Sequence, residues 1–423
     1  MPLRILLAFV LALSVAGFAR AQNGRVPSAP VAEMTDGGAV RMPAWRRRAL
    51  LRKDSLWAEA LRIHFNALVM DGHVDTPSLM RRGYDFGKRH RSFEGHVDLP
   101  RLFEGGLDAP FFSIYVPASL GEGKRATDRA RALIAEVKRQ AAAHADSAAM
   151  AYSAADVRRI TRGGRKAILL GLEGGHALAG STDVLRELYE AGIRYVTLTH
   201  VNTNGWADAS QTPSRWDGLN DLGRRMVRAM NRLGILVDLS HASDATFYDA
   251  LAVSEAPVIL SHSSTRALTD VVRNVDDDML RALAAHGGVV MINFYEPMVN
   301  RGLTPDVMDE VYRRLGGRTG DLRRLWAAVF AVRQERGLPP AGLDDVLAHI
   351  DHAVRVAGID HVALGSDFDG ARMPAGLDDV TRLPWITYAL LRRGYSEEEI
   401  YKLLGGNTLR ALEAAERVAK SPP

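Results

Sequence analysis

From residue 68 onwards, two kinds of segment alternate along the chain. The first kind is a short apolar run, typical of a strand that is buried on both faces of a parallel sheet. The second is a longer segment whose apolar residues recur with helical spacing. The apolar runs occupy residues 68–71, 109–116, 167–172, 195–199, 235–239, 258–260, 288–293 and 362–365, and helical segments between them include 127–143, 182–191, 222–233, 245–252 and 277–285.

This alternation predicts an α/β fold, a (β/α)8 TIM-type barrel whose chemistry sits at the carboxyl ends of the strands. A doubly wound open sheet is the alternative, but no glycine-rich phosphate loop follows the first strand to support it. One connection, from Pro297 to about His352, is unusually long and helical in pattern. It predicts a helical insertion before the last strand, packed beside the barrel mouth.

The amino-terminal residues have the pattern of a secretory signal peptide, predicted at 1–21. Arg4 precedes an apolar run, and Ala19-Arg20-Ala21 matches a cleavage site. An uncleaved anchor is the alternative, although the apolar run is short for a bilayer span. Residues 22–57 are predicted to be a spacer and an amino-terminal helical segment, and 58–418 the barrel. The protein is therefore expected to be exported, either periplasmic or secreted.

Composition narrows the classes of function and of site. A hydrophobic content of 47% supports a large core, and a net charge of +4 without a basic stripe gives no reason to expect a nucleic-acid partner. The chain has no cysteine, which excludes disulfides, thiolate ligands and a lipidated cysteine. The tail after residue 418 lacks the hydrophobic end of a lipid-anchor signal, so no stable membrane anchor is expected. Any metal must be held by His, Asp and Glu.

The first apolar run ends in His73-Val74-Asp75. Side chains two apart in a strand point to the same face, so His73 and Asp75 are expected to project together. An imidazole and a carboxylate placed in this way make half of a zinc site. The alternative is a hydrogen-bonded core histidine followed by an aspartate that caps the next helix.

Further candidate ligands follow three later strands. Glu173 ends the run 167–172, and a buried carboxylate is costly unless it is paired or coordinated, so it is the candidate to bridge two metals. A salt bridge to an arginine is the alternative. Two adjacent strands end in Ser-His, which places His241 and His262 at the same height and would complete a second metal site with Glu173. Asp238 and the serines could orient the imidazoles.

Two other strand ends carry residues suited to the reaction itself. His200 follows the run 195–199 and is expected to donate a hydrogen bond to a substrate carbonyl, with a further metal ligand as the alternative. Asp367 follows the last strand, where a carboxylate could take a proton from water and pass it to a leaving amine. Asp369 is expected to be structural.

These residues resemble the membrane (renal) dipeptidases, zinc peptidases of the amidohydrolase-like barrel class. The resemblance runs from about Leu61 to Val418. It rests on the segments Asp71-Gly72-His73-Val74-Asp75, Gly171-Leu172-Glu173-Gly174, Leu198-Thr199-His200, Ser240-His241, Ser261-His262-Ser263-Ser264, Arg273-Asn274-Val275 and Gly365-Ser366-Asp367-Phe368-Asp369-Gly370.

The resemblance implies a cofactor of two Zn²⁺ ions per chain and dipeptide substrates. It assigns His73, Asp75 and Glu173 to one zinc, and Glu173, His241 and His262 to the other. His200, Arg273 and Tyr295 would bind substrate, with Arg273 on its carboxyl terminus, and Asp367 would move protons. Animal members use cysteines for disulfides, including one that joins subunits. This chain has none, so a non-covalent homodimer is expected.

The expected reaction is hydrolysis of the peptide bond of dipeptides by a hydroxide that bridges two zinc ions. One alternative is another metal-dependent amidohydrolase acting on a non-peptide amide or ester. Those enzymes usually begin with His-x-His on the first strand, whereas this chain has His73-Val74-Asp75. A second alternative is a non-catalytic exported binding protein, which is disfavoured because all five metal positions and Asp367 are filled.

Overall fold

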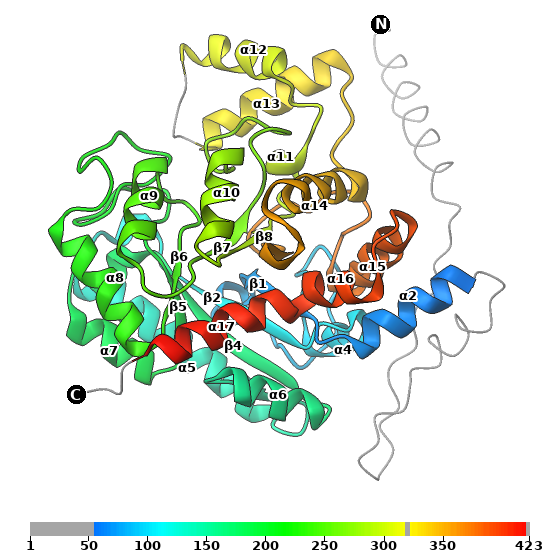
Figure 1. The fold of residues 1–423 in the computed structure, drawn as a ribbon, viewed down its shortest axis with the longest axis horizontal. Coiled ribbons are helices and arrows are strands. Elements are labelled where there is room, and N and C mark those ends of the chain that lie inside the picture. Colours follow the sequence, from blue (N-terminus) through cyan, green and yellow to red (C-terminus); the bar gives the residue numbers. More distant parts are fainter. Residues whose placement is uncertain (1–54, 318–321, 420–423) are drawn as a thin grey trace, which may run out of the picture.

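The computed structural model describes residues 55–317 and 322–419, and their centre is a barrel of parallel strands (Figure 1). The strands neighbour one another in the order β1-β2-β4-β5-β6-β7-β8-β9. Their bounds are β1 (Met70–Val74), β2 (Ala109–Tyr115), β4 (Lys166–Glu173), β5 (Ile193–Thr197), β6 (Leu236–Asp238), β7 (Ile259–Ser263), β8 (Val289–Ile292) and β9 (Val362–Leu364). The predicted (β/α)8 barrel is confirmed, and the open-sheet alternative is wrong.

Helices connect the strands and cover the barrel. They are α2 (Ser55–Asn66), α3 (Thr76–Met80), α4 (Leu99–Gly105), α5 (Lys124–Ala143), α6 (Ala154–Arg162), α7 (Thr182–Glu190), α8 (Asp221–Leu233), α9 (Asp244–Val253), α10 (Asp277–Ala285), α14 (Leu343–Ala357), α15 (Leu383–Arg392), α16 (Glu397–Tyr401) and α17 (Asn407–Val418). Several begin at a side chain that accepts a hydrogen bond from the first turn, such as Ser243 for α9 and Asp276 for α10. Such caps fix where the helices start.

The barrel closes between its first and last strands largely through residues that follow β9. Val74 of β1 forms a parallel bridge with Phe368, and the Asp75 N–H donates to the Phe368 carbonyl at 2.7 Å. Nearer the amino-terminal end of β1, a side chain links the same two segments, because Oδ1 of Asp71 accepts a hydrogen bond from the Ser366 N–H at 2.9 Å. Closure therefore joins the segment that holds Asp75 directly to the segment that follows β9.

The interior of the barrel is filled from its amino-terminal end. Inward side chains of the strands form one apolar cluster with α17, including Met70, Phe111, Leu169, Tyr195, Leu236, Ile259, Met291, Ala363, Leu409 and Leu412. α17 contacts β1, β6, β8 and β9 and crosses this end of the barrel. The carboxyl ends of the strands are therefore the end left for chemistry.

Glycines make room for two large side chains halfway up the barrel. A Cβ at Gly171 would overlap the ring of Tyr195, and a Cβ at Gly72 or Gly365 would press on Met291. Tyr195 and Met291 are fully buried. The glycines in the strand motifs thus serve the packing of the layer beneath the polar strand ends.

The predicted helical insertion lies between β8 and α14 and is confirmed. It comprises α11 (Glu296–Val299), α12 (Pro305–Leu315) and α13 (Leu322–Arg336), of which α12 and α13 are drawn in yellow at the top of Figure 1. The helices share an apolar cluster that includes Val311, Trp326 and Val329. The insertion is shorter than predicted, because α14 packs on β8 and β9 as a barrel helix.

Other differences from the sequence prediction are local. β1 extends to Val74, and Pro77 lies in the first turn of α3, where its missing N–H costs nothing, so it starts a helix. A short strand that was not predicted, β3 (Ala148–Met150), pairs with β4 beside the barrel. The predicted signal peptide at 1–21 and residues 22–54 of the predicted spacer lie outside the described residues.

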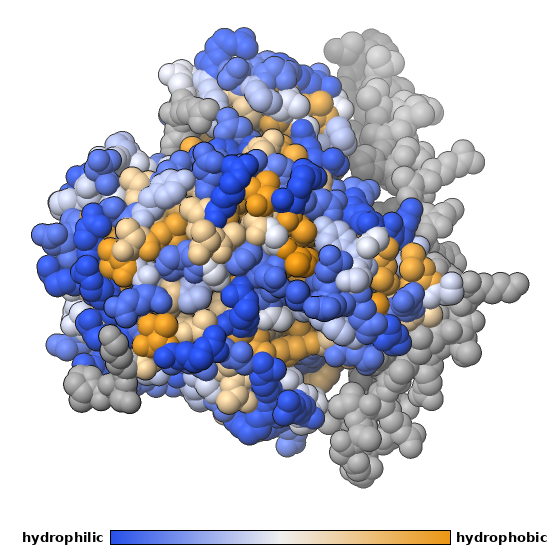
Figure 2. All heavy atoms as spheres, viewed as in Figure 1, coloured by the Kyte–Doolittle hydropathy of each residue, from blue (hydrophilic) through white to orange (hydrophobic). Residues whose placement is uncertain are grey.

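Apolar residues on the face shown in Figure 2 lie in several separate groups between charged ones. Large hydrophobic side chains exposed in the described part of the chain are Phe93, Tyr152 and Tyr248. Within residues 55–317 and 322–419, every helix is too short or too polar to cross a bilayer.

Candidate metal centre

His73 and Asp75 meet at the carboxyl end of β1, as their spacing predicted. Nε2 of His73 lies 3.3 Å from Oδ2 of Asp75. The pairing of β1 with β2 shifts register between Asp71 and Val74. With strict alternation, neighbouring residues such as Gly72 and His73 would face opposite sides of the strand. The register shift allows both to face the barrel interior, with His73 nearer the carboxyl end.

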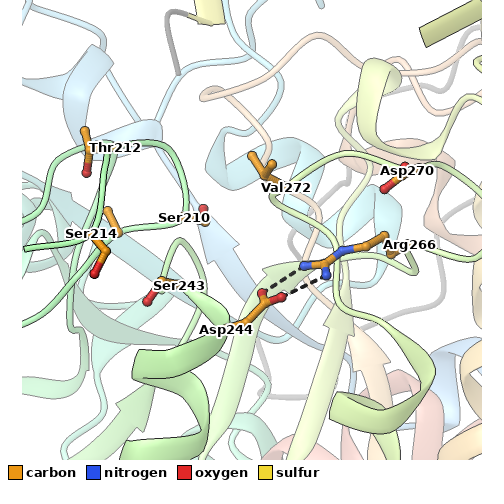
Figure 3. A pocket seen from close by; sticks show the side chains of 9 residues that line it. Ser210, Thr212, Ser214, Ser243, Asp244, Arg266, Asp270 and Val272 are labelled. Atoms are coloured by element: carbon orange, nitrogen blue, oxygen red, sulfur yellow. Dashed lines mark hydrogen bonds and ion pairs between the residues drawn. The ribbon is translucent and has the colours of Figure 1, made fainter. Parts of the chain in front are cut away.

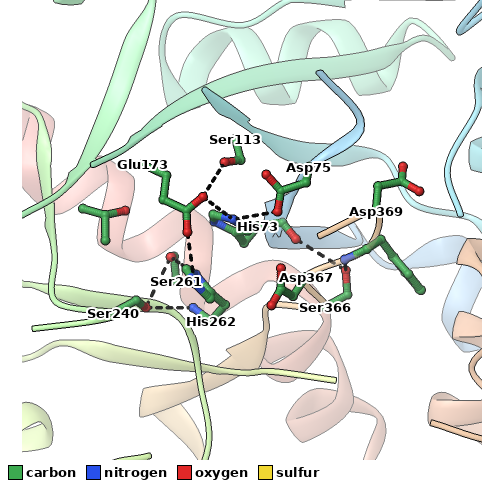
Figure 4. Close-up of polar contacts among 12 residues, drawn as sticks. His73, Asp75, Ser113, Glu173, Ser240, Ser261, His262, Ser366, Asp367 and Asp369 are labelled. Atoms are coloured by element: carbon green, nitrogen blue, oxygen red, sulfur yellow. Dashed lines mark hydrogen bonds and ion pairs between the residues drawn. The ribbon is translucent and has the colours of Figure 1, made fainter. Parts of the chain in front are cut away.

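Glu173, the last residue of β4, points towards His73 and His262 (Figure 4). Its Oε2 is 3.5 Å from Nε2 of His73, and its Oε1 is 3.3 Å from Nε2 of His241 and 3.5 Å from Nε2 of His262. Its ion-pair partners in the described part of the chain are all histidines, which argues against the salt bridge to an arginine. Each carboxylate oxygen therefore faces a different half of the cluster.

His241 and His262 come from neighbouring strand ends and face each other. Their Nε2 atoms are 3.0 Å apart. His241 has a φ of 69°, which is a left-handed backbone conformation. This conformation is strained for residues other than glycine, and such strain is concentrated at functional sites. Its carbonyl accepts a hydrogen bond from the Ser210 N–H at 2.8 Å, which helps to hold this backbone.

Hydrogen bonds fix the orientation of His262. The Ser261 hydroxyl donates its only proton to Oδ2 of Asp238 at 2.6 Å, so at 2.8 Å it accepts from Nδ1–H of His262. The lone pair of this imidazole is then on Nε2, which faces Glu173. Asp238 and Ser261 thus do what the sequence predicted for them, and hydrogen bonds of this kind are what tune metal-ligating histidines.

Two supporting residues were missed by the sequence reasoning. The Tyr195 hydroxyl lies 2.8 Å from Nδ1 of His73, and the Ser113 hydroxyl donates to Oε2 of Glu173 at 3.1 Å. Both lie inside apolar runs, and the pattern of these runs predicts only that they belong to strands. A polar residue on the inward face of a buried strand was the signal available for Ser113, while Tyr195 depends on the space that Gly171 leaves.

The donor set fits metal ions, and zinc in particular. Ligand atoms within 4.8 Å of one another form three groups: His73, Glu173 and His262; Glu173, His200 and His241; and His73, Asp75 and Asp367. Tetrahedral zinc with bonds of about 2.0–2.2 Å holds its ligands roughly 3.3–3.5 Å apart, and the closest imidazole–carboxylate separations match. Nε2 of His73 is buried without a hydrogen-bond partner, which a metal would supply.

Burial and charge give Glu173, His241 and His262 protonation states that suit metal binding. Burial alone would raise the pKa of Glu173, but His73, His200 and His241 hold that pKa well below its usual range. Burial lowers the pKa of His241 and His262 well below that of free histidine, with Arg273 adding to the effect. An ionised carboxylate and neutral imidazoles are the forms that coordinate metals. Burial alone would lower the pKa of His73, but Tyr195, Glu173 and Asp75 raise it well above that of free histidine, so a metal would have to displace its proton.

Asp367 stands at the side of the cluster nearest β1. Its backbone is left-handed, with a φ of 63°, and its Oδ2 accepts a hydrogen bond from Asn293 at 3.2 Å. Burial, together with the carboxylates of Asp75 and Glu173, raises the pKa of Asp367 to about 8. A Cβ at Gly370 would overlap both Asp75 and Asp367, so the turn after β9 requires glycine there.

The expected substrate-binding residues surround the same centre. Nε2 of His200 is 3.8 Å from Oε1 of Glu173. Arg273 is 7% exposed, donates to the His262 carbonyl at 3.2 Å, and has its pKa lowered to about 10, chiefly by burial. The ring of Tyr295 meets Trp326 of the insertion edge-on at 5.6 Å. Tyr295 also interacts electrostatically with Asp367, which connects it to the same centre.

A separate polar pocket of about 310 Å³ lies between the loop around residues 209–214 and the segment 266–272 (Figure 3). Hydroxyls of Ser210, Thr212, Ser214 and Ser243 line it, with Val272 beside Arg273. Arg266 forms a two-pronged ion pair with Asp244 across it, at 2.9 Å for each bond. No residue of the metal cluster lines this pocket.

Comparison with known proteins gives a consistent picture. The family model of the membrane dipeptidases (peptidase family M19) matches residues 57–423. Dipeptidase tcpJ of Claviceps purpurea is 38% identical over 368 residues, covering 83% of this chain and 78% of its own.

Solved structures agree. The probable dipeptidase PvdM from Pseudomonas aeruginosa is 27% identical, with a TM-score of 0.75 over 87% of this chain and 100% of its own. A metallopeptidase from Rhodobacter sphaeroides, solved with a phosphinate mimic of the dipeptide L-Ala-D-Ala, is 28% identical, with a TM-score of 0.68 over 82% of this chain and 99% of its own. The chain belongs to the membrane dipeptidase family, peptidase family M19, and is a dipeptidase of that metallopeptidase family.

Proposed function

We propose that the chain hydrolyses the peptide bond of free dipeptides at a centre of two zinc ions. His73, Asp75 and Glu173 would hold one ion, and Glu173, His241 and His262 the other. The observation that carries this proposal is the placement of Glu173, whose two oxygens face separate groups of ligands at 3.3–3.5 Å. A carboxylate so placed is suited to bridge a pair of metals.

Zinc ions bound there would polarise the peptide carbonyl and lower the pKa of water from about 15.7 towards 7. The protein's own groups do the rest. Asp367 is positioned to accept the proton of the attacking water and to return it to the leaving amine, because burial raises its pKa and makes its carboxylate a stronger base than that of a free aspartate. His200 is placed to donate a hydrogen bond to the carbonyl oxygen as negative charge develops.

Arg273 is proposed to bind the substrate's terminal carboxylate. Its guanidinium is buried at the site and uses one donor on the His262 carbonyl, while a guanidinium fork suits a carboxylate. A free carboxyl end within reach of the zinc ions limits substrates to dipeptides. The Rhodobacter sphaeroides relative, solved with a mimic of L-Ala-D-Ala, supports this substrate class.

The setting of the enzyme is a further part of the proposal. Residues 1–21 would direct export and be removed, which places the barrel in the periplasm or the medium. The mature chain would form a non-covalent homodimer. Amino-terminal sequencing of the exported protein, and its mass in solution by light scattering, test these two statements separately.

The substrate proposal is tested with a panel of free dipeptides, the same dipeptides amidated at the carboxyl end, and tripeptides. The zinc-loaded protein should hydrolyse only the free dipeptides, and a chelator should abolish the activity. Arg273→Ala should raise KM for free dipeptides by roughly 10- to 100-fold, as expected when a charge-assisted fork is lost. Hydrolysis of a non-peptide amide or ester alone would favour another amidohydrolase, and no turnover of any kind would favour a binding protein.

A further inference from the structure

Three arginines lie together on the side of the site where Tyr115 ends β2, and none of them has an acidic partner in the described part of the chain. Arg81 and Arg82 directly follow α3, and Arg129 lies in the second turn of α5, which packs against α3. Within the described residues, no carboxylate is within ion-pair distance of any of the three. Nε of Arg129 is buried and has no hydrogen-bond partner. We call these residues the arginine cluster.

This arrangement is unfavourable for the protein alone. Burial lowers the pKa of Arg129, and the neighbouring charges of Arg81 and Arg82 lower it further. By contrast, the fully buried Arg101 is paired with the carboxylates of Asp98 and Asp379. Arg81 and Arg82 are exposed and Arg129 is partly buried, so a carboxylate can reach all three and would relieve their mutual repulsion. The missing anion is therefore expected to come from a ligand.

Tyr115 connects the arginine cluster with the reaction centre. It is the last residue of β2, its ring meets that of His200 edge-on at 5.0 Å, and it interacts electrostatically with Glu173 and Arg129. Among the eight strands of the barrel, β2 stands opposite β7, after which Arg273 follows. A dipeptide whose carboxyl end reaches Arg273 thus extends its amino-terminal residue towards Tyr115.

We propose that Arg81, Arg82 and Arg129 bind a carboxylate on the side chain of the substrate's amino-terminal residue, so that acidic dipeptides are the preferred substrates. This inference rests on the proposed function. The substrate's free amine is a cation and is repelled by the arginines, so it lies away from them. The side chain is the part of the residue that can carry an anion to the cluster.

The test compares Glu-Ala, Gln-Ala and Lys-Ala as substrates of the zinc-loaded protein. Glutamine has the shape of glutamate without its charge, so the ratio of kcat/KM for Glu-Ala over Gln-Ala isolates the charge. We expect a ratio of roughly tenfold or more, because a hydrogen bond between two charged groups is stronger than one to a neutral amide. Lys-Ala should be the poorest substrate, and added salt should reduce the ratio.

Variants assign the preference to the cluster. Arg129→Gln should bring the ratio towards one, whereas Arg129→Lys, which keeps the charge, should retain part of it. Arg186→Gln is the matched control, because Arg186 is exposed on α7 away from the site. A structural effect of Arg129→Gln would lower both substrates equally and leave the ratio unchanged, and that result would overturn the proposal.

The inference and the proposed function fail differently. Hydrolysis of Glu-Ala and Gln-Ala at equal rates by the unaltered protein leaves the dipeptidase proposal intact and overturns the role of the arginines. If no dipeptide is hydrolysed, the proposed function fails. The affinities of Glu-Ala and Gln-Ala for the same preparation, measured by calorimetry, then test whether the arginine cluster binds a carboxylate. Equal binding overturns it, and tighter binding of Glu-Ala that weakens in Arg129→Gln supports it.

Discussion

The hydroxyl of Tyr195 lies 2.8 Å from Nδ1 of His73, and this contact joins the packed interior of the barrel to the metal centre. Tyr195 reaches this position because the neighbouring strand has Gly171, where any side chain would overlap its ring. The hydrogen bond fixes the plane of the imidazole and leaves Nε2 facing Asp75 and Glu173. Packing below the site therefore sets the orientation of a ligand within it.

Removing this hydroxyl should weaken metal binding without unfolding the protein. Tyr195→Phe keeps the ring in its pocket, so we expect a loss of zinc affinity of roughly 10- to 100-fold, the usual cost of losing a partner of a ligating histidine. Competition with a chelator measures it. Tyr248→Phe, on the exposed face of α9, is the control and should leave the affinity unchanged. Equal zinc affinities in the unaltered protein and both variants would show that Tyr195 does not support metal binding.

Filling the space beside Tyr195 should disturb both stability and the site. Gly171→Ala forces the tyrosine ring to move, and overpacking of this kind costs about 1–3 kcal/mol of unfolding free energy. Zinc affinity should fall with it, because the bond to His73 is lost. Gly342→Ala is the control, since its backbone φ is −129° and the nearest atom to the added Cβ is at 3.5 Å. Denaturant unfolding of both variants shows whether the effect is specific to position 171.

Replacing the proton-transfer group should slow the reaction more than it weakens substrate binding. Asp367→Asn keeps the shape and the contact with Asn293 but cannot take a proton, so kcat should fall by roughly 10²–10⁴ with a smaller change in KM. The variant should still bind zinc if Asp367 is not a ligand, which metal analysis measures in the same preparation. A kcat that matches the unaltered protein contradicts the assigned role.

A buried histidine away from the metals should make stability depend on pH. His349 of α14 bonds to Thr265 and Thr269 in the segment that leads to Arg273, and burial lowers its pKa to about 3. As the pH falls, the unfolded chain, in which a histidine has a pKa near 6.5, binds a proton at a higher pH than the folded protein does. Stability is thus complete above pH 6.5 and falls as the pH drops towards 3, with a slope approaching about 1.4 kcal/mol per pH unit.

This slope is measurable by unfolding the metal-free protein in denaturant at several pH values. His349→Asn should be less stable near pH 7 but should lose less stability on acidification than the unaltered protein. Parallel curves for His349→Asn and the unaltered protein would contradict the assignment.

The sequence was most informative where a strand's apolar run ends in a polar residue. That rule located the ends of β1, β4, β6 and β7 that carry the candidate metal ligands, because a buried carboxylate or imidazole is costly unless it is paired or coordinated. It also predicted the barrel, since alternating strands and helices leave few ways to bury both faces of the strands. The helical insertion followed from the length of one connection.

Features that depend on distant partners were not predictable in this way. Tyr195 acts on His73 only because a glycine on another strand leaves room, and the arginine cluster forms only because α3 packs against α5. β3 is too short for its pattern to distinguish it from a loop. The end of the insertion was misplaced because α14 and α13 have similar helical patterns, and only packing on β8 and β9 separates them.

Titration of the chelator-stripped protein with zinc, followed by hydrolysis of a free dipeptide at each point, tests the central claim most directly. The account predicts that activity rises until two zinc ions are bound per chain and that Glu173→Gln loses both the second ion and the activity. Full activity with one ion or none, or a Glu173→Gln variant that keeps two ions and full activity, would contradict it.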